Sequence, residues 1–128
     1  MVAMAQTVFM VDDDASIRTA VRRLLKSSGF SVSVFSSAEA FWQSDFKTTS
    51  GCLILDIRLP GMNGYELLEL FLASGVYLPT IVITGHDRAG MEERAMQLGA
   101  SSYLRKPFDE ETLLGAINSA MNHYRVAI

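Results

Sequence analysis

Five short apolar runs alternate with five helical patterns along the 128 residues of this chain. No other feature of the sequence limits the possible folds as strongly. The apolar runs end near Val11, Phe35, Asp56, Thr84 and Arg105, and each is followed by residues with the spacing of an amphipathic helix. Strict alternation of strands and helices predicts a parallel sheet with helices on both faces, joined by right-handed crossovers.

The number of repeats narrows this prediction to an α/β fold, a (βα)5 three-layer sandwich. Five parallel strands suit the flavodoxin-like order 2-1-3-4-5, in which the ends of strands one, three and four meet where the order reverses. A chain of this length is enough for one domain with one core. We expect one domain over residues 1–128, with its core at about 7–123.

Polar residues predict where the helices begin. Ser36 and Glu39 have the spacing of a capping box, in which two side chains bond each other's backbone. Asn63, Asp87 and Asp109 each precede a helical pattern and are expected to cap it. Glycines that follow the helical patterns predict helix ends.

Chemically reactive groups follow four of the apolar runs. Three aspartates, Asp12–Asp14, follow the first, Asp56 ends the third, Thr84 ends the fourth and Lys106 follows the fifth. Asp14 suits a helix cap, but three acids exceed what capping needs. Because parallel strands end at one edge of a sheet, we expect these groups to meet there.

The expected cluster can hold a cation and handle a phosphoryl group. Carboxylate oxygens without nearby histidine or cysteine favour a hard cation, and Mg²⁺ is the natural choice. A carboxylate can also attack phosphorus to give an acyl phosphate. The charge that develops then needs Mg²⁺, a hydroxyl and an ammonium around it, and Thr84 and Lys106 carry the last two.

Composition excludes several other classes of protein. The net charge is -3 and lysine and arginine form no block, so direct binding of nucleic acid is not expected. Cys52 is the one cysteine, which excludes an internal disulfide and fits a reducing compartment. The sequence shows neither a membrane span nor a signal peptide, so we expect no membrane contact and a cytoplasmic location.

The motifs together resemble the receiver domain of two-component response regulators, from about Thr7 to His123. The matching stretches are Val11–Asp13, Leu55–Gly64, Ile83–His86 and Lys106–Phe108. The Thr-Gly-His segment and Lys-Pro-Phe are most similar to receivers of the nitrogen-fixation (FixJ-like) transcription regulators. Such receivers normally precede a DNA-binding domain and none follows here, so we expect a stand-alone receiver or one taken from a longer regulator.

This resemblance implies a phosphoacceptor and a metal site. Asp56 would take a phosphoryl group from a histidine kinase or a phosphotransfer protein. Mg²⁺ would be held by Asp13, Asp56 and the backbone carbonyl of Arg58, with Asp12 acting mainly through water. The protein would then be a regulator that assists its own phosphotransfer and dephosphorylation, and not an enzyme.

The resemblance also implies a conformational switch. Thr84 and Lys106 would bind phosphoryl oxygens, Lys106–Pro107 would be a cis peptide, and the Tyr103 ring would move when Thr84 engages the phosphoryl group. Arg58 and His86, each two residues past a site residue, are expected to tune the phosphoryl lifetime. The fourth helix, fifth strand and fifth helix would form the output face, where phosphorylation promotes homodimerisation or partner binding.

Two other functions fit parts of the pattern. Asp12 and Asp14 after an apolar strand also look like the nucleophile and acid/base of a haloacid-dehalogenase-like phosphatase, with Thr84 and Lys106 binding phosphate. That class needs a further acidic pair at a later strand end, and it leaves Asp56 without a role. A flavodoxin-like binding module is the third possibility, but no phosphate-binding loop rich in glycine or serine follows strand one.

Overall fold

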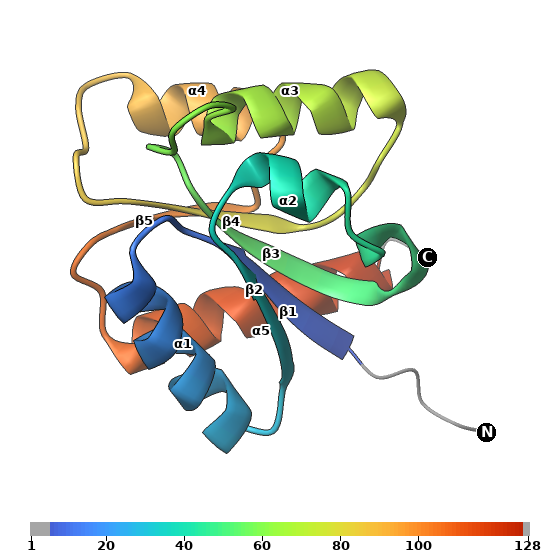
Figure 1. Ribbon diagram of the computed structural model, residues 1–128, viewed down its shortest axis with the longest axis vertical. Coiled ribbons are helices and arrows are strands. Elements are labelled where there is room, and N and C mark those ends of the chain that lie inside the picture. The colour runs from blue at the N-terminus through green and yellow to red at the C-terminus, as the bar shows by residue number, and fades with distance from the viewer. Residues whose placement is uncertain (1–5, 127–128) are drawn as a thin grey trace.

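The computed structural model contains one sheet of five parallel strands in the order β2-β1-β3-β4-β5 (Figure 1). It describes residues 6–126, so residues 1–5 and 127–128 of the expected domain lie outside the described residues. The strands are β1 (Gln6–Val11), β2 (Ser31–Phe35), β3 (Ser50–Asp56), β4 (Thr80–Thr84) and β5 (Ser102–Arg105). The helices are α1 (Ala15–Ser27), α2 (Ala38–Trp42), the 3₁₀ turn η1 (Phe46–Thr48), α3 (Gly64–Ser74), α4 (Met91–Gln97) and α5 (Glu110–Val126). The predicted α/β class and strand order are confirmed.

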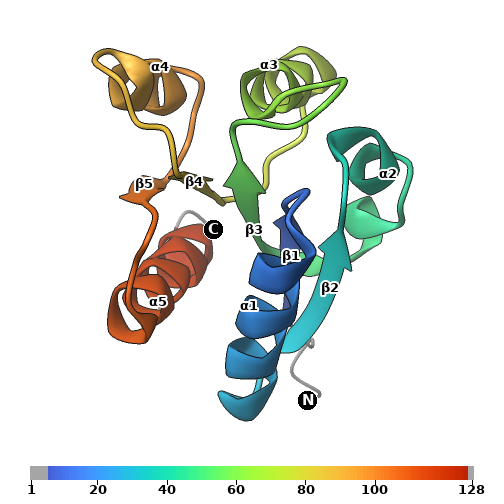
Figure 2. The same cartoon turned by 60° about the vertical axis from the view of Figure 1, so that its left-hand side comes forward.

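The helices cover both faces of the sheet. Helices α1 and α5 lie on one face, and α2, α3 and α4 lie on the other (Figure 2). Successive side chains of a strand point to opposite faces, so each central strand supplies both layers of the core. In β3, Cys52 and Ile54 face α1 and α5, whereas Leu53 and Leu55 face the other three helices. This explains why the central strands read as continuous apolar runs.

Aromatic rings fill the core beneath α2. The rings of Phe41 and Phe46 stack with their centroids 4.3 Å apart, and Phe9 and Phe71 contact the same cluster. Aromatic pairs of this kind contribute about 0.5–1.5 kcal/mol beyond the area that they bury. Together they anchor α2, which has only five residues and could not persist alone.

A glycine allows the two central strands to pair closely. Gly51 adopts a φ of +153°, and a Cβ atom built there would lie 1.7 Å from the carbonyl oxygen of Thr7 in β1. Any other residue would push β1 and β3 apart.

Two of the predicted helix caps are wrong. Helix α2 is capped by Ser37, whose Oγ accepts a hydrogen bond from the Ala40 amide at 3.1 Å, so the predicted pairing of Ser36 with Glu39 is not formed. Helix α4 begins after Gly90, and Asp87 bonds side chains of β5 instead of capping it. In both cases a carboxylate expected to act at a helix start bonds a partner elsewhere: Glu39 bonds the Met62 amide, and Asp87 bonds Tyr103 and Arg105.

The other caps are as predicted. Asp14 caps α1, and Asn63 forms a complete capping box with Glu66 at the start of α3. Asp109 precedes α5 and accepts a hydrogen bond from the Thr112 amide at 2.7 Å.

None of the helices within residues 6–126 has the length and apolar content that crossing a membrane requires.

Candidate functional site

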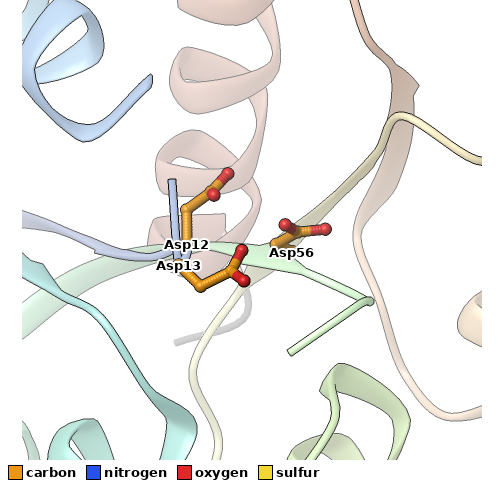
Figure 3. A group of neighbouring side chains, drawn as sticks. All are labelled: Asp12, Asp13 and Asp56. Carbon is orange, nitrogen blue, oxygen red and sulfur yellow. The ribbon is translucent and has the colours of Figure 1, made fainter. Parts of the chain in front are cut away.

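Three carboxylates meet at the carboxyl edge of the sheet. Asp12 and Asp13 follow β1 and Asp56 ends β3, and one oxygen of each lies within 4.8 Å of the others (Figure 3). Asp12 and Asp56 are buried, with 0% and 5% of their surface exposed, whereas Asp13 is exposed. The predicted convergence of these three carboxylates is therefore confirmed.

The loop after β1 holds Asp12 in place by contacts on both sides of the residue. Its Oδ1 accepts a hydrogen bond from the Asp14 amide at 2.9 Å, and Asp14 in turn caps α1. The guanidinium of Arg18 donates to the Asp12 carbonyl oxygen at 2.7 Å. Arg18 was not identified from the sequence, because an arginine on the first turns of a helix usually faces solvent.

Lys106 joins the two buried carboxylates. Its Nζ donates to Asp12 Oδ2 at 2.9 Å and to Asp56 Oδ2 at 3.3 Å. Its amide donates to the Thr84 carbonyl at 2.7 Å, and the Lys106–Pro107 peptide bond is cis. The chain after β5 is thus held to the end of β4, with the ammonium over the acids.

The electrostatics of the cluster are unbalanced. Burial, and then the neighbouring charge of Asp12, raise the pKa of Asp56, although Lys106 opposes the rise. Burial disfavours the ammonium of Lys106, but its bonds and charge interactions with Asp12 and Asp56 prevail, and its pKa is raised. One ammonium therefore stands among three carboxylates, and the site can accommodate more positive charge.

Arg58 and His86 border this cluster, as expected. They line a cleft of about 400 Å³ whose other walls come from Asp12–Asp14, Ile17, Asp56, Gly85 and Lys106. The Arg58 amide donates to Asp56 Oδ1 at 3.3 Å, and the His86 amide donates to Thr84 Oγ1 at 3.1 Å. Thr84 itself is buried, with 1% of its surface exposed, and is not among the residues that line the cleft.

Tyr103 lies outside the cleft and has its own polar network. Its ring is already buried, with 7% of the residue exposed, and its hydroxyl donates to Asp87 at 2.5 Å. Arg105 bonds the second oxygen of Asp87 at 2.6 Å and Glu92 of α4 at 2.9 Å. This network ties the loop after β4 to β5, and the sequence pattern did not indicate it.

The donor set of the cleft suits a hard divalent cation. Its oxygens come from carboxylates, and neither histidine nor cysteine nitrogen or sulfur belongs to the cluster. Asp13 is exposed and its carboxylate accepts no hydrogen bond among the described residues, so it can turn toward a ligand without losing a partner. The residues present therefore fit Mg²⁺.

The chain belongs to the response regulator receiver domain family, whose sequence model matches residues 8–118. It is thus a receiver domain of two-component signalling, a class of signalling proteins. Within the family it is FixJ-like. It is 38% identical over 114 residues to the transcriptional regulatory protein FixJ of Azorhizobium caulinodans, with 89% of this chain and 54% of the relative covered.

Other similarities agree with this assignment. The response regulator TodT of Pseudomonas putida F1 is 39% identical over 117 residues, with 91% of this chain and 52% of TodT covered. Among solved structures, the response regulator StyR has a TM-score of 0.88 at 43% identity, over 98% of this chain and 64% of that one. The FixJ-N structure has a TM-score of 0.84 at 36% identity, over 94% and 97%. The chain spans about half the length of FixJ and TodT.

The phosphatase alternative finds no support. The phosphatase hypothesis gives Asp56 no role, yet Asp56 belongs to the site and bonds the same ammonium, that of Lys106, as Asp12 does. The acids after Lys106 do not supply the missing pair at a strand end, because Asp109 caps α5 and Glu110 begins it.

Proposed function

We propose that this receiver accepts a phosphoryl group on Asp56 from a histidine kinase or a phosphotransfer protein. The observation that carries the proposal is the ammonium of Lys106 bound to Asp56 and Asp12 at the mouth of a carboxylate-lined cleft. In the transfer, an Asp56 oxygen attacks phosphorus, the P–N bond of the donor phosphohistidine breaks, and the imidazole keeps the electron pair and takes up a proton. Asp56 presents one buried oxygen to Lys106 and one to the Arg58 amide, which fixes the direction of attack.

Mg²⁺ is the cofactor that this proposal requires. Asp12, Asp13, Asp56 and the backbone carbonyl of Arg58 would hold it, with Asp12 acting mainly through water. When bound, the cation offsets negative charge on the phosphoryl oxygens. Lys106 would then leave its contact with the carboxylates and donate to a phosphoryl oxygen, and the Thr84 hydroxyl would donate to another.

The output of the switch is proposed to lie on α4, β5 and α5. Engagement of Thr84 would move the loop after β4, and Tyr103 would report the movement because its hydroxyl bonds Asp87 in that loop. Because Tyr103 is already buried, we expect activation to change the hydrogen-bond partner of its hydroxyl more than the burial of its ring. The altered face would bind a partner or a second copy of the chain, without direct contact to nucleic acid. We place this activity in the cytoplasm, in one domain that spans residues 1–128.

Phosphorylation with a small-molecule donor tests the proposal. The protein is treated with phosphoramidate and Mg²⁺, and the modified residue is mapped after borohydride reduction of the acyl phosphate. We expect one phosphoryl group per chain on Asp56, and none in Asp56→Asn. Modification of Asp12 in the wild type would instead support the phosphatase, and full labelling of Asp56→Asn at another residue would contradict the proposal.

A further inference from the structure

Glu39 makes a contact that neither its own helix nor the receiver chemistry described above uses. Its Oε2 accepts a hydrogen bond from the backbone amide of Met62 at 3.0 Å, across 23 residues of sequence. Ser37 already caps α2, so the carboxylate is not needed there. The amide of Met62 lowers the pKa of Glu39, as expected for a carboxylate that accepts this bond.

The partner of Glu39 lies in the loop that connects β3 to α3. This loop is fixed near its two ends: the Ile57 amide bonds the Ile83 carbonyl at 3.2 Å, and Asn63 forms the capping box of α3. Between residues 59 and 62, the bond from Met62 to Glu39 is the one hydrogen bond within the described part of the chain. The buried side chain of Leu59 is the other anchor of this stretch.

A glycine makes room for the carboxylate. Gly61 adopts a φ of +74°, and a Cβ atom built there would lie 2.4 Å from Glu39 Oε2. The absence of a side chain thus lets Glu39 lie directly against the loop backbone. Two requirements coincide at this position, because a left-handed φ also favours glycine.

We propose that Glu39 is a positioning residue for the metal site, and that it acts by holding the β3–α3 loop in the conformation that presents the Arg58 carbonyl. This inference rests on the proposed Mg²⁺ site. Arg58 lies four residues before Met62 in the same loop, and its amide bonds the phosphoacceptor Asp56. Release of the loop at Met62 would remove the one hydrogen bond between residues 59 and 62 among the described residues. The buried side chain of Leu59 would then be the remaining hold on the stretch that follows Arg58.

The test is a calorimetric titration of metal-free protein with MgCl₂. Groups that bond a metal ligand directly contribute about 10–100-fold to metal affinity, and Glu39 acts one step further away, so Glu39→Ala should bind Mg²⁺ about threefold to tenfold more weakly. Glu39→Gln keeps an oxygen acceptor of the same reach and should stay within about twofold of wild type, since a neutral acceptor loses only part of the bond strength.

Control variants show whether a change in Mg²⁺ affinity comes from the place of the Glu39 carboxylate, from its charge, or from a less stable fold. Glu69→Ala removes an exposed carboxylate of α3 and should leave Mg²⁺ affinity unchanged. Glu39→Asp keeps the charge but is one methylene shorter, so it should weaken binding as Glu39→Ala does; it also replaces that variant if alanine prevents folding. A melting curve of each metal-free variant reports any effect on the fold alone.

Each outcome decides a different point. If Glu39→Ala and Glu39→Asp bind Mg²⁺ as wild type does, even with a lower melting temperature, Glu39 is only structural and the inference is overturned. Equal losses in Glu39→Ala and Glu39→Gln would assign the effect to charge and would also overturn it. Failure of the wild type to bind Mg²⁺ would instead refute the metal site of the proposed function.

Discussion

The hydroxyl of Tyr103 in β5 donates a hydrogen bond to the carboxylate of Asp87 in the loop that follows β4. This bond is the largest reason that the pKa of Asp87 is lowered, and Arg105 adds to it. Burial, and then the hydrogen bond and charge of Asp87, raise the pKa of Tyr103. The loop that carries His86 and the strand that follows α4 are therefore joined directly.

Removal of this hydroxyl should be visible in the titration of Asp87. In Tyr103→Phe and in Arg105→Gln, the pKa of Asp87 should rise toward its ordinary value. A carboxyl group whose pKa is lowered in the folded state stabilises the fold at pH values above its ordinary pKa of about 3.9. This contribution is lost as the pH falls through the lower pKa of the folded state. Carboxyl-carbon NMR titrations of the wild type and the two variants measure these shifts, and an unchanged pKa of Asp87 in Tyr103→Phe would contradict the prediction.

Asp56→Asn should stabilise the metal-free protein at neutral pH. Since the folded-state pKa of Asp56 is raised, its ionised form costs stability, and the cost appears as pH rises through that pKa. The gain should be of the order of 1 kcal/mol at pH 7 and should vanish toward pH 4. Urea unfolding in EDTA measures it, with Asp45→Asn as an exposed control; a gain that grows as pH falls would reverse the argument.

Mg²⁺ should raise the melting temperature of the wild-type protein. Binding to the folded state stabilises it by mass action, by about 2.7 kcal/mol when free Mg²⁺ is 100 times the dissociation constant. Asp13→Asn should melt higher than wild type in EDTA, because one like charge is gone, and should respond less to Mg²⁺. Scanning calorimetry in EDTA and in MgCl₂ measures the melting temperature of each protein and its increase with Mg²⁺. A wild-type melting temperature that does not change with millimolar Mg²⁺ would rule out the site.

Arg58 and His86 should set the lifetime of the phosphorylated state. Both line the cleft around Asp56, where a side chain can block or orient an attacking water. Replacement of both by alanine should change the dephosphorylation rate several-fold, whereas Arg88→Ala, outside this cleft, should not. Loss of phosphorylated protein can be followed on phosphate-affinity gels, and equal rates in all three proteins would leave both side chains without this role.

Activation should alter amide exchange beyond the cleft. A phosphoryl analogue that draws Thr84 toward Asp56 displaces the loop that holds Asp87, and the displacement should reach β5 through Tyr103. Hydrogen exchange with and without beryllofluoride and Mg²⁺ should therefore change in residues 84–108. Changes confined to the residues around Asp56 would exclude this route.

The fold could be predicted because its signals are local and repeated. Each apolar run with its following helical pattern identifies one βα unit, and parallel pairing then brings Asp12, Asp56, Thr84 and Lys106 to one edge without further information. Local signals also explain why Asp14, Asn63 and Asp109 were predicted correctly as caps, since each bonds an amide two or three residues away.

The contacts that could not be predicted join exposed polar side chains to distant backbone or side chains. Glu39 has the spacing of a cap partner yet bonds Met62, and Asp87 precedes a helix yet bonds Tyr103. Such pairs leave no periodic pattern, because a solvent-exposed carboxylate can serve a local or a distant donor equally well. Only the relative placement of the loops decides between them.

The burial of Cys52 makes this chain convenient for spectroscopy. Its side chain lies in the core between β3 and α5, and burial raises the pKa of the thiol to about 12, so almost none of it is thiolate at neutral pH. Thiolates are the nucleophiles that attack maleimide and thiol-reactive spin-label reagents, and no other cysteine is present. A cysteine placed at exposed Met96 of α4 would therefore carry a fluorophore or spin label alone, without prior removal of a native thiol.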